Sequence, residues 1–171
     1  ALRGIPAVYF HGLMGSRNDV QLALRTKVKR NVNRAVLEAA LLERNLNDPG
    51  SKVNLIRDQF GRLLEMRVRH RAFHPNGAQR VLLLDPRVFA VLRTSPGEDG
   101  HILALTNVTS RACRLEIPLA GTGLDDDLWY DLVAGRGWAA EGGTLPVLLQ
   151  EYDVMWLTPF RELERDIESP E

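Results

Sequence analysis

Residues 4–19 read GIPAVYFHGLMGSRND, a run of apolar residues that opens into a polar loop with two glycines. The run from Ile5 to Phe10 is apolar at nearly every position, which is typical of a strand covered on both faces in a parallel sheet. Gly12, Gly15 and Asn18 then indicate a loop that leaves the carboxyl end of this strand. The stretch therefore predicts one strand of a parallel sheet and the loop that follows it.

Two helices are expected after this loop. Apolar residues spaced for one helix face begin at Asn33, and the sequence Asn-Asp-Pro-Gly at 47–50 ends that pattern. The second helix begins at about Ser51, a suitable N-cap, and has apolar residues at intervals of three and four up to Val68. The sequence His-Pro-Asn-Gly at 74–77 then closes a helical half of the chain.

Beyond Gly77 the pattern changes to short strands separated by turn clusters, as in an antiparallel sandwich. Leu115, Ile117 and Leu119 alternate with polar or turn residues, so one face of their strand should meet a core. The fold class is therefore α+β. The expected strands cover residues 80–85, 88–94, 101–107, 114–119, 128–133 and a long stretch at 145–157.

Composition and charge limit the cellular context and the partners. The chain has the composition of a globular protein, no leader peptide and no apolar run long enough for a bilayer, so we expect a cytoplasmic protein without membrane contact. The single cysteine, Cys113, excludes an internal disulfide and should lie in a strand or the core. Residues 1–80 carry 15 basic and 6 acidic side chains, residues 81–171 carry 7 and 16, but no nucleic-acid-binding motif accompanies the basic half, and no nucleic acid is expected.

A strand followed by a loop and a helix is the repeating unit of a (β/α)8 barrel, whose functional loops follow the strands. Residues Gly4 to Phe10 resemble the GxPxxY segment on the eighth barrel strand of glycoside hydrolase family 13, the α-amylase superfamily. The loop His11 to Asp19 lacks the acidic residue of many amylases. With the sequence Arg30-Asn31-Val32-Asn33-Arg34 it is similar to the branch of sucrose phosphorylases and glucosylglycerate phosphorylases.

The resemblance implies three parts of the chain. Residues 1–77 would be the C-terminal end of the catalytic barrel, with its last strand, active-site loop and helices. Residues 78–160 would be the antiparallel β-sandwich C-terminal domain of the family, and residues 161–171 a charged tail.

The resemblance also implies a retaining phosphorylase of carbohydrate metabolism. Such enzymes use an Asp nucleophile and a Glu acid/base about 5–5.5 Å apart, and phosphate attacks the glucosyl intermediate to release glucose 1-phosphate. Neither carboxylate has a matching position here, because Asp19 is the only acid in residues 1–35. We assign no catalytic residue and predict that the chain alone is inactive. The complete enzyme would take an α-glucoside and inorganic phosphate.

Five residues are candidates for substrate binding. In the resemblance, Arg30 pairs with an upstream Asp and donates hydrogen bonds to glucosyl hydroxyls, whereas the alternative is a solvated basic turn. His11, Arg17, Asn18 and Asp19 would line the acceptor and phosphate side, where Arg17 could attract an anion, unless the loop is only structural.

No cofactor or metal is expected. His70 and His74 are spaced for one helix face but have no third ligand, so they should cap and solvate the helix end. A free-standing sandwich that binds carbohydrate or a partner protein is the alternative function. Its aromatic residues could stack on sugar rings, although buried packing is their commoner use: Trp129, Trp138 and Trp156. The acceptor sugar and the oligomeric state stay open.

Overall fold

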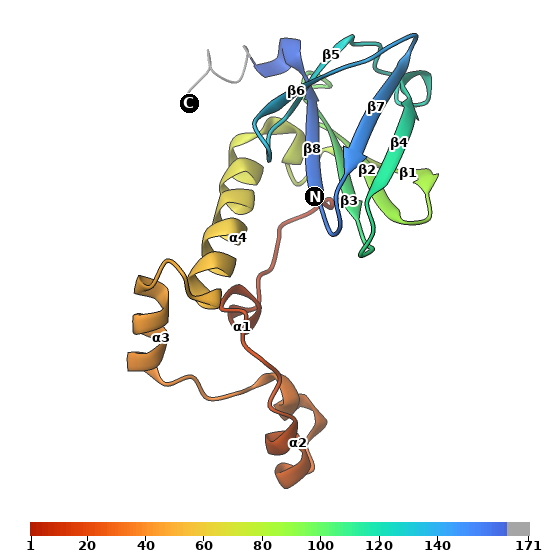
Figure 1. Ribbon diagram of the computed structural model, residues 1–171. Coiled ribbons are helices and arrows are strands. Elements are labelled where there is room, and N and C mark those ends of the chain that lie inside the picture. The colour runs from red at the N-terminus through yellow and green to blue at the C-terminus, as the bar shows by residue number, and fades with distance from the viewer. Residues whose placement is uncertain (164–171) are drawn as a thin grey trace. The chain divides into compact units, whose positions relative to one another are not determined.

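The computed structural model describes residues 1–163 (Figure 1). Contacts within the chain divide it into two compact units. The helical unit comprises Pro6–Glu65, and the sandwich unit comprises Ala1–Ile5 together with the chain from Met66 onward. The three parts expected from the sequence stay a prediction, and most of the expected charged tail, 161–171, lies outside the described residues. Within residues 1–163, no helix combines the length and the hydrophobicity needed to cross a membrane.

The helical unit contains short helices joined by ordered turns. Ser51 caps the longest helix as predicted, because its Oγ accepts a hydrogen bond from the backbone N–H of Asn54 at 3.0 Å. The helix expected from Asn33 begins six residues later, at Ala39, since residues 29–33 form a 3₁₀ turn instead. The elements are α1 (Phe10–Leu13), α2 (Val20–Thr26), η1 (Lys29–Asn33), α3 (Ala39–Asn47) and α4 (Lys52–Arg69), which enters the sandwich unit at Met66.

The expected strand from Ile5 to Phe10 is wrong as a secondary-structure prediction. These residues form no strand, Phe10 already belongs to α1, and the side chain of Ile5 is 85% exposed. A parallel strand is stable only when neighbouring strands accept and donate its backbone hydrogen bonds on both sides. Every strand pair among the described residues is antiparallel and lies after residue 77, so this segment has no partner.

The sandwich unit confirms the expected antiparallel β domain and the α+β class. Its six-stranded sheet has the order β1-β2-β3-β8-β5-β6, and β4 pairs with β7 in a second sheet (Figure 1). The strands are β1 (Ala78–Asp85), β2 (Val88–Thr94), β3 (His101–Asn107), β4 (Cys113–Pro118), β5 (Leu128–Asp131), β6 (Arg136–Ala139), β7 (Thr144–Leu149) and β8 (Val154–Pro159). Two short 3₁₀ turns, η2 (Arg71–Phe73) and η3 (Leu119–Gly121), complete the unit.

The middle strands of the large sheet, β2, β3 and β8, are largely buried. Alternate residues of β2, namely Val88, Ala90 and Leu92, join the core between the two sheets. The residues between them point to the opposite face, which η2 contacts. On that face the rings of Phe73 and Trp156 lie 4.7 Å apart, so the turn after α4 is fixed to the sheet by aromatic packing.

Two details of the strand prediction differ from the structure. The stretch 145–157 is not one strand but β7 and β8, which belong to different sheets and are joined by a turn in which Tyr152 has φ 55°. The strand β6 has no counterpart in the prediction. Cys113 lies in β4 and is buried, as expected.

Candidate functional site

The predicted loop starts in α1 and turns at Gly15. Gly15 has φ +58°, the left-handed region that favours glycine, and a Cβ atom placed on it would also displace the side-chain end of Ile56. His11 lies in α1 beside two aromatic rings, with ring centroids 5.3 Å from Tyr9 and 6.0 Å from Phe10. Its Nδ1 is buried without a hydrogen-bond partner among the described residues.

Asp19 joins the two ends of the candidate site. Its Oδ1 accepts a hydrogen bond from the backbone N–H of Leu22 at 2.7 Å and so caps α2. Its own N–H donates to the carbonyl of Val32 at 2.6 Å. The structure therefore brings the loop of residues 11–19 next to the turn that carries Arg30, and it uses the Asp19 carboxylate as a helix cap.

The segment 24–34, called the basic turn below, is held by hydrogen bonds of its own. Oγ1 of Thr26 accepts from Nδ2 of Asn31 at 2.9 Å and donates to the carbonyl of Leu22 at 2.8 Å. Lys27, which ends α2, has the left-handed φ of 56°. The hydroxyl of Tyr9 donates to the carbonyl of Asn33 at 2.7 Å.

The arginines of the site point to solvent. Arg30 lies in η1, Arg17 and Asn18 lie just before α2, and all three are exposed. No residue within 1–163 accepts a hydrogen bond from either guanidinium or pairs with its charge. The backbone that carries Arg30 is thus fixed while its side chain is free to bind a ligand.

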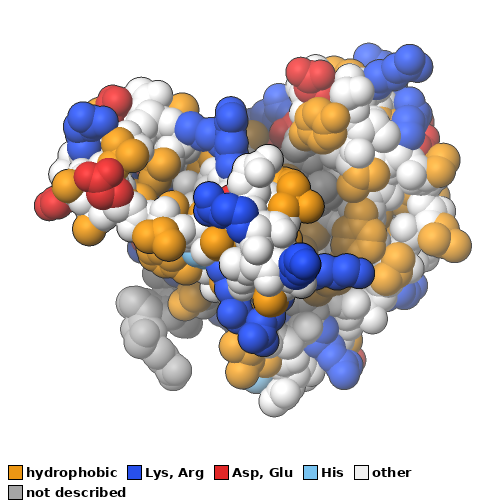
Figure 2. Space-filling model, turned by 90° about the horizontal axis from the view of Figure 1, so that it is seen from below, with side chains coloured by type: hydrophobic (Ala, Val, Ile, Leu, Met, Phe, Trp, Pro, Cys, Tyr) orange, Lys and Arg blue, Asp and Glu red, His pale blue; other side chains and the backbone are white. Residues whose placement is uncertain are grey.

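The charge of this part of the chain is uniform. Between Asp19 and Glu38 there are five basic residues and no acidic one: Arg25, Lys27, Lys29, Arg30 and Arg34. Figure 2 shows both basic and acidic side chains on the face drawn. Such a segment can attract and bind anions, but it offers no carboxylate for acid/base chemistry, since Asp19 is engaged at the cap.

Sequence reasoning missed the residues that hold the basic turn in place. Tyr9 was expected inside a strand, and Thr26 carries no motif signal, yet their hydroxyls bond to the turn. The sequence signal that could have identified these residues is a hydroxyl side chain close to a run of charged residues, because hydroxyl groups bond readily to nearby backbone. The substrate-binding roles of His11, Arg17, Asn18, Asp19 and Arg30 stay predictions.

His70 and His74 were expected to cap and solvate the end of the helix, but His70 is buried and caps η2 instead. Nδ1 of His70 accepts from the N–H of Ala72, and Nδ1 of His74 accepts from the N–H of Asn76, each at 3.2 Å. Both bonds order the connection between α4 and β1.

The three tryptophans of the sandwich unit pack against other residues of the unit. Trp129 is fully buried in the core, and its Nε1 donates to the carbonyl of Asp126 at 2.8 Å. Trp156 is buried under Phe73. Trp138 is partly exposed, but the guanidinium of Arg136 lies 4.7 Å from its ring centre and covers it. These positions favour aromatic packing over stacking on sugar rings.

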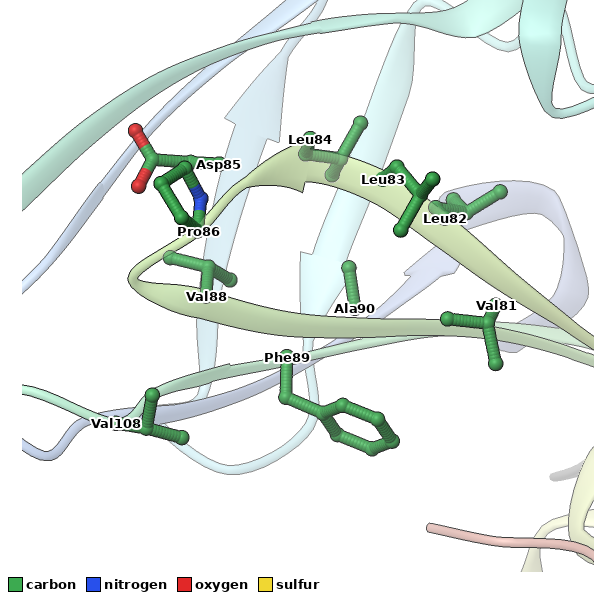
Figure 3. Close-up of a pocket in the computed structure, with 10 residues that line it drawn as sticks. All are labelled: Val81, Leu82, Leu83, Leu84, Asp85, Pro86, Val88, Phe89, Ala90 and Val108. Atoms are coloured by element: carbon green, nitrogen blue, oxygen red, sulfur yellow. The ribbon is translucent and has the colours of Figure 1, made fainter.

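A groove of about 640 Å³ lies along the hairpin of β1 and β2 (Figure 3). Its lining is apolar except for Asp85, whose carboxylate is paired with Arg87 at 2.8 Å. Sugar recognition needs several convergent hydrogen-bonding groups. The groove therefore lacks the chemistry of a glucoside site.

Comparison with known proteins gives homologues of one kind. No protein-family model matches the chain. The glucosylglycerate phosphorylase of Spirochaeta thermophila is 32% identical over 95% of this chain, that of Allomeiothermus silvanus 40% over 65%, and that of Escherichia coli 26% over 90%. The chain spans only 28%, 20% and 25% of the lengths of these three relatives.

Solved structures share the fold at low identity. AmyP in complex with maltose has a TM-score of 0.68 and 17% identity over 85% of this chain and 28% of its own. An Anoxybacillus α-amylase has a TM-score of 0.56 and 16% identity over 74% of this chain and 25% of its own. Homology to glucosylglycerate phosphorylases over most of the chain, together with the fold of α-amylases, identifies this chain as a C-terminal part of a protein of glycoside hydrolase family 13.

Proposed function

We propose that the chain supplies the C-terminal part of a retaining α-glucosyl phosphorylase. The substrate would be glucosylglycerate or a related α-glucoside such as sucrose, and the product glucose 1-phosphate. Support for the phosphorylase class comes from the three glucosylglycerate phosphorylases that match the chain. The single observation that carries the residue-level proposal is the basic turn, whose backbone is fixed while the Arg30 guanidinium is exposed and unpaired.

The chemistry requires two carboxyl groups. A glutamic acid protonates the leaving oxygen of the acceptor while an aspartate attacks the anomeric carbon and forms a glucosyl ester. A phosphate oxygen then attacks the same carbon, the ester carboxylate leaves, and the glutamate accepts the proton of the phosphate. We propose that both carboxyl groups lie outside this chain, because Asp19 is the only acid in residues 6–35 and caps α2. The 171-residue chain alone would then be inactive.

The exposed arginines would act on the substrate side. Arg30 would donate hydrogen bonds to glucosyl hydroxyls and pair with an aspartate of the barrel. Arg17, with His11, Asn18 and Asp19, would line the acceptor and phosphate side. Phosphate and glycerate are both anions, so the positive charge of this segment would raise their local concentration.

Phosphate-dependent release of glucose 1-phosphate from glucosylglycerate and from sucrose tests the proposal. We expect no activity from the 171-residue chain and activity when it is fused behind the part of the Spirochaeta thermophila relative that has no counterpart in this chain. In that longer protein, Arg30→Gln should lower kcat/KM about 10- to 100-fold, the loss expected for one or two charged hydrogen bonds. Arg44→Gln, which removes an exposed guanidinium from the last turn of α3, outside the basic turn, is the matched control and should change little.

Activity of the chain alone would refute the assignment of both carboxyl groups to other segments. Equal kcat/KM for Arg30→Gln and the unsubstituted protein would refute the role of Arg30. Inactivity of both proteins would favour the alternative, a sandwich that binds carbohydrate or a partner protein. We also propose a cytoplasmic location, supported by the unpaired thiol of Cys113.

A further inference from the structure

Arg93 is a charged residue with no exposed surface. It lies on β2 and points to the face of the sheet that η2 contacts, where its Nη2 donates to the carbonyl of His74 at 2.8 Å. Its Nε and Nη1 are buried, and no acceptor among the described residues lies within hydrogen-bond reach of them. Gly77 forms one wall, since a Cβ atom there would lie 3.2 Å from Nη2.

A second guanidinium enters the same region from α4. Nη2 of Arg67 donates to the carbonyls of Leu2 at 3.0 Å and Gly4 at 2.7 Å, and its guanidinium carbon lies 5.2 Å from the ring centre of Phe73. Its Nη1 is buried and has no acceptor within residues 1–163. All of these residues belong to the sandwich unit.

The two guanidiniums, of which that of Arg93 is fully buried and that of Arg67 partly buried, feel each other's charge. Burial lowers the pKa of both, and the positive charges of Arg67 and Arg3 lower the pKa of Arg93 further. A guanidinium stays protonated in proteins, so the positive charge remains. No carboxylate in the part of the chain described here is paired with either side chain. Buried charges are ordinarily paired, and an unmade hydrogen bond of a buried charged group is unfavourable.

We propose that Arg67 and Arg93 form a binding site for one carboxylate group. A carboxylate has two oxygens with about four acceptor positions, enough to bridge the unpaired N–H groups of both side chains and to neutralise part of their charge. The carboxylate belongs either to a free small molecule or to an Asp or Glu side chain of a polypeptide.

Thermal unfolding of the full 171-residue chain in sodium acetate, at constant ionic strength, tests the site. We expect Tm to rise with acetate along a saturation curve. Arg93→Met and Arg67→Met should each remove this rise. The matched control is Arg114→Gln, which removes an exposed guanidinium from β4 and should keep it. An equal rise in Arg93→Met or Arg67→Met and in the unsubstituted chain would overturn the proposal.

A second measurement does not depend on the folding of a variant. In the chain labelled with ¹⁵N-arginine, the side-chain N–H signals of Arg67 and Arg93 should shift with acetate and saturate, while those of exposed Arg62 should not. Absence of a saturable shift would overturn the site, and equal binding of inorganic phosphate would overturn the choice of a carboxylate. Binding of N-acetyl-aspartic acid amide, compared with that of acetate, identifies the source of the carboxylate. Tighter binding than acetate indicates an Asp or Glu side chain of a polypeptide, and weaker binding indicates a free small molecule.

Discussion

Replacement of Gly77 by alanine should destabilise the sandwich unit. The added Cβ would lie 2.5 Å from the carbonyl oxygen of Thr94 and 3.1 Å from that of His74, and both are backbone atoms. Neither can turn away as a side chain could, and Ala78 directly pairs with Thr94 in the register of β1 and β2. The strands must therefore separate locally, and we expect the free energy of unfolding to fall by about 1–3 kcal/mol, the usual cost of overpacking.

The same substitution at Gly61 should have the opposite sign. Gly61 lies in the middle of α4, and a Cβ atom there would meet nothing within 4 Å. Alanine at this position should add about 0.5–1 kcal/mol, because glycine loses more backbone entropy in a helix. Urea unfolding measures both: tryptophan fluorescence follows the sandwich unit, which holds Trp129, Trp138 and Trp156, and far-UV circular dichroism follows the helix. An unchanged or higher midpoint for Gly77→Ala would refute the argument from backbone contact.

Three further predictions concern carboxylates. Asp19→Ala should lower helical stability by about 1 kcal/mol through loss of the α2 cap, whereas Asp19→Asn should retain most of it, as read by far-UV circular dichroism during urea unfolding. Hydrogen bonds from Arg87 hold the pKa of Asp85 at about 2, below its value in the unfolded chain, so the stabilisation is complete above about pH 4 and is lost as the pH falls towards 2. Asp85→Asn should thus lower the urea midpoint at neutral pH and leave it unchanged at about pH 2. Burial raises the pKa of the Asp131 carboxyl above its value in the unfolded chain, so its protonated form stabilises the fold at low pH. This stabilisation is lost as the pH rises through the folded-state pKa. Over that pH range the urea midpoint of Asp131→Asn should increase relative to the midpoint of the unsubstituted chain.

The sequence was most informative where local pattern and tertiary environment agree. The bounds expected for β2 and β3, 88–94 and 101–107, are those of the structure, because each strand is a compact apolar run closed by turn residues. Ser51 was correctly expected at the start of α4, since a cap acts over three residues only. The alternation of β4, with Leu115 and Ile117 buried, follows from the same local rule.

Prediction failed where the outcome depends on partners distant in the sequence. The apolar run at Ile5 to Phe10 has the composition of a buried strand, but a strand exists only with a neighbour to bond. In the stretch 145–157 the polar residues Gln150, Glu151 and Asp153 mark the turn, but nothing local shows that β7 pairs with β4 while β8 pairs with β3 and β5. β6 is short and contains Gly137, which weakens any strand signal before the hairpin with β5 is known.

The same difference between local pattern and distant partners applies to the charged residues. Arg30 and Arg93 are the same residue type, yet Arg30 is exposed on a fixed turn and Arg93 is completely buried on β2. Sequence resemblance could select Arg30, because a motif surrounds it. It gave no reason to select Arg93, which lies in an apolar strand pattern and becomes notable only when α4 places Arg67 near it. A site built from residues 26 positions apart on two elements has no local signature, and unpaired hydrogen-bond donors are then the observation that reveals it.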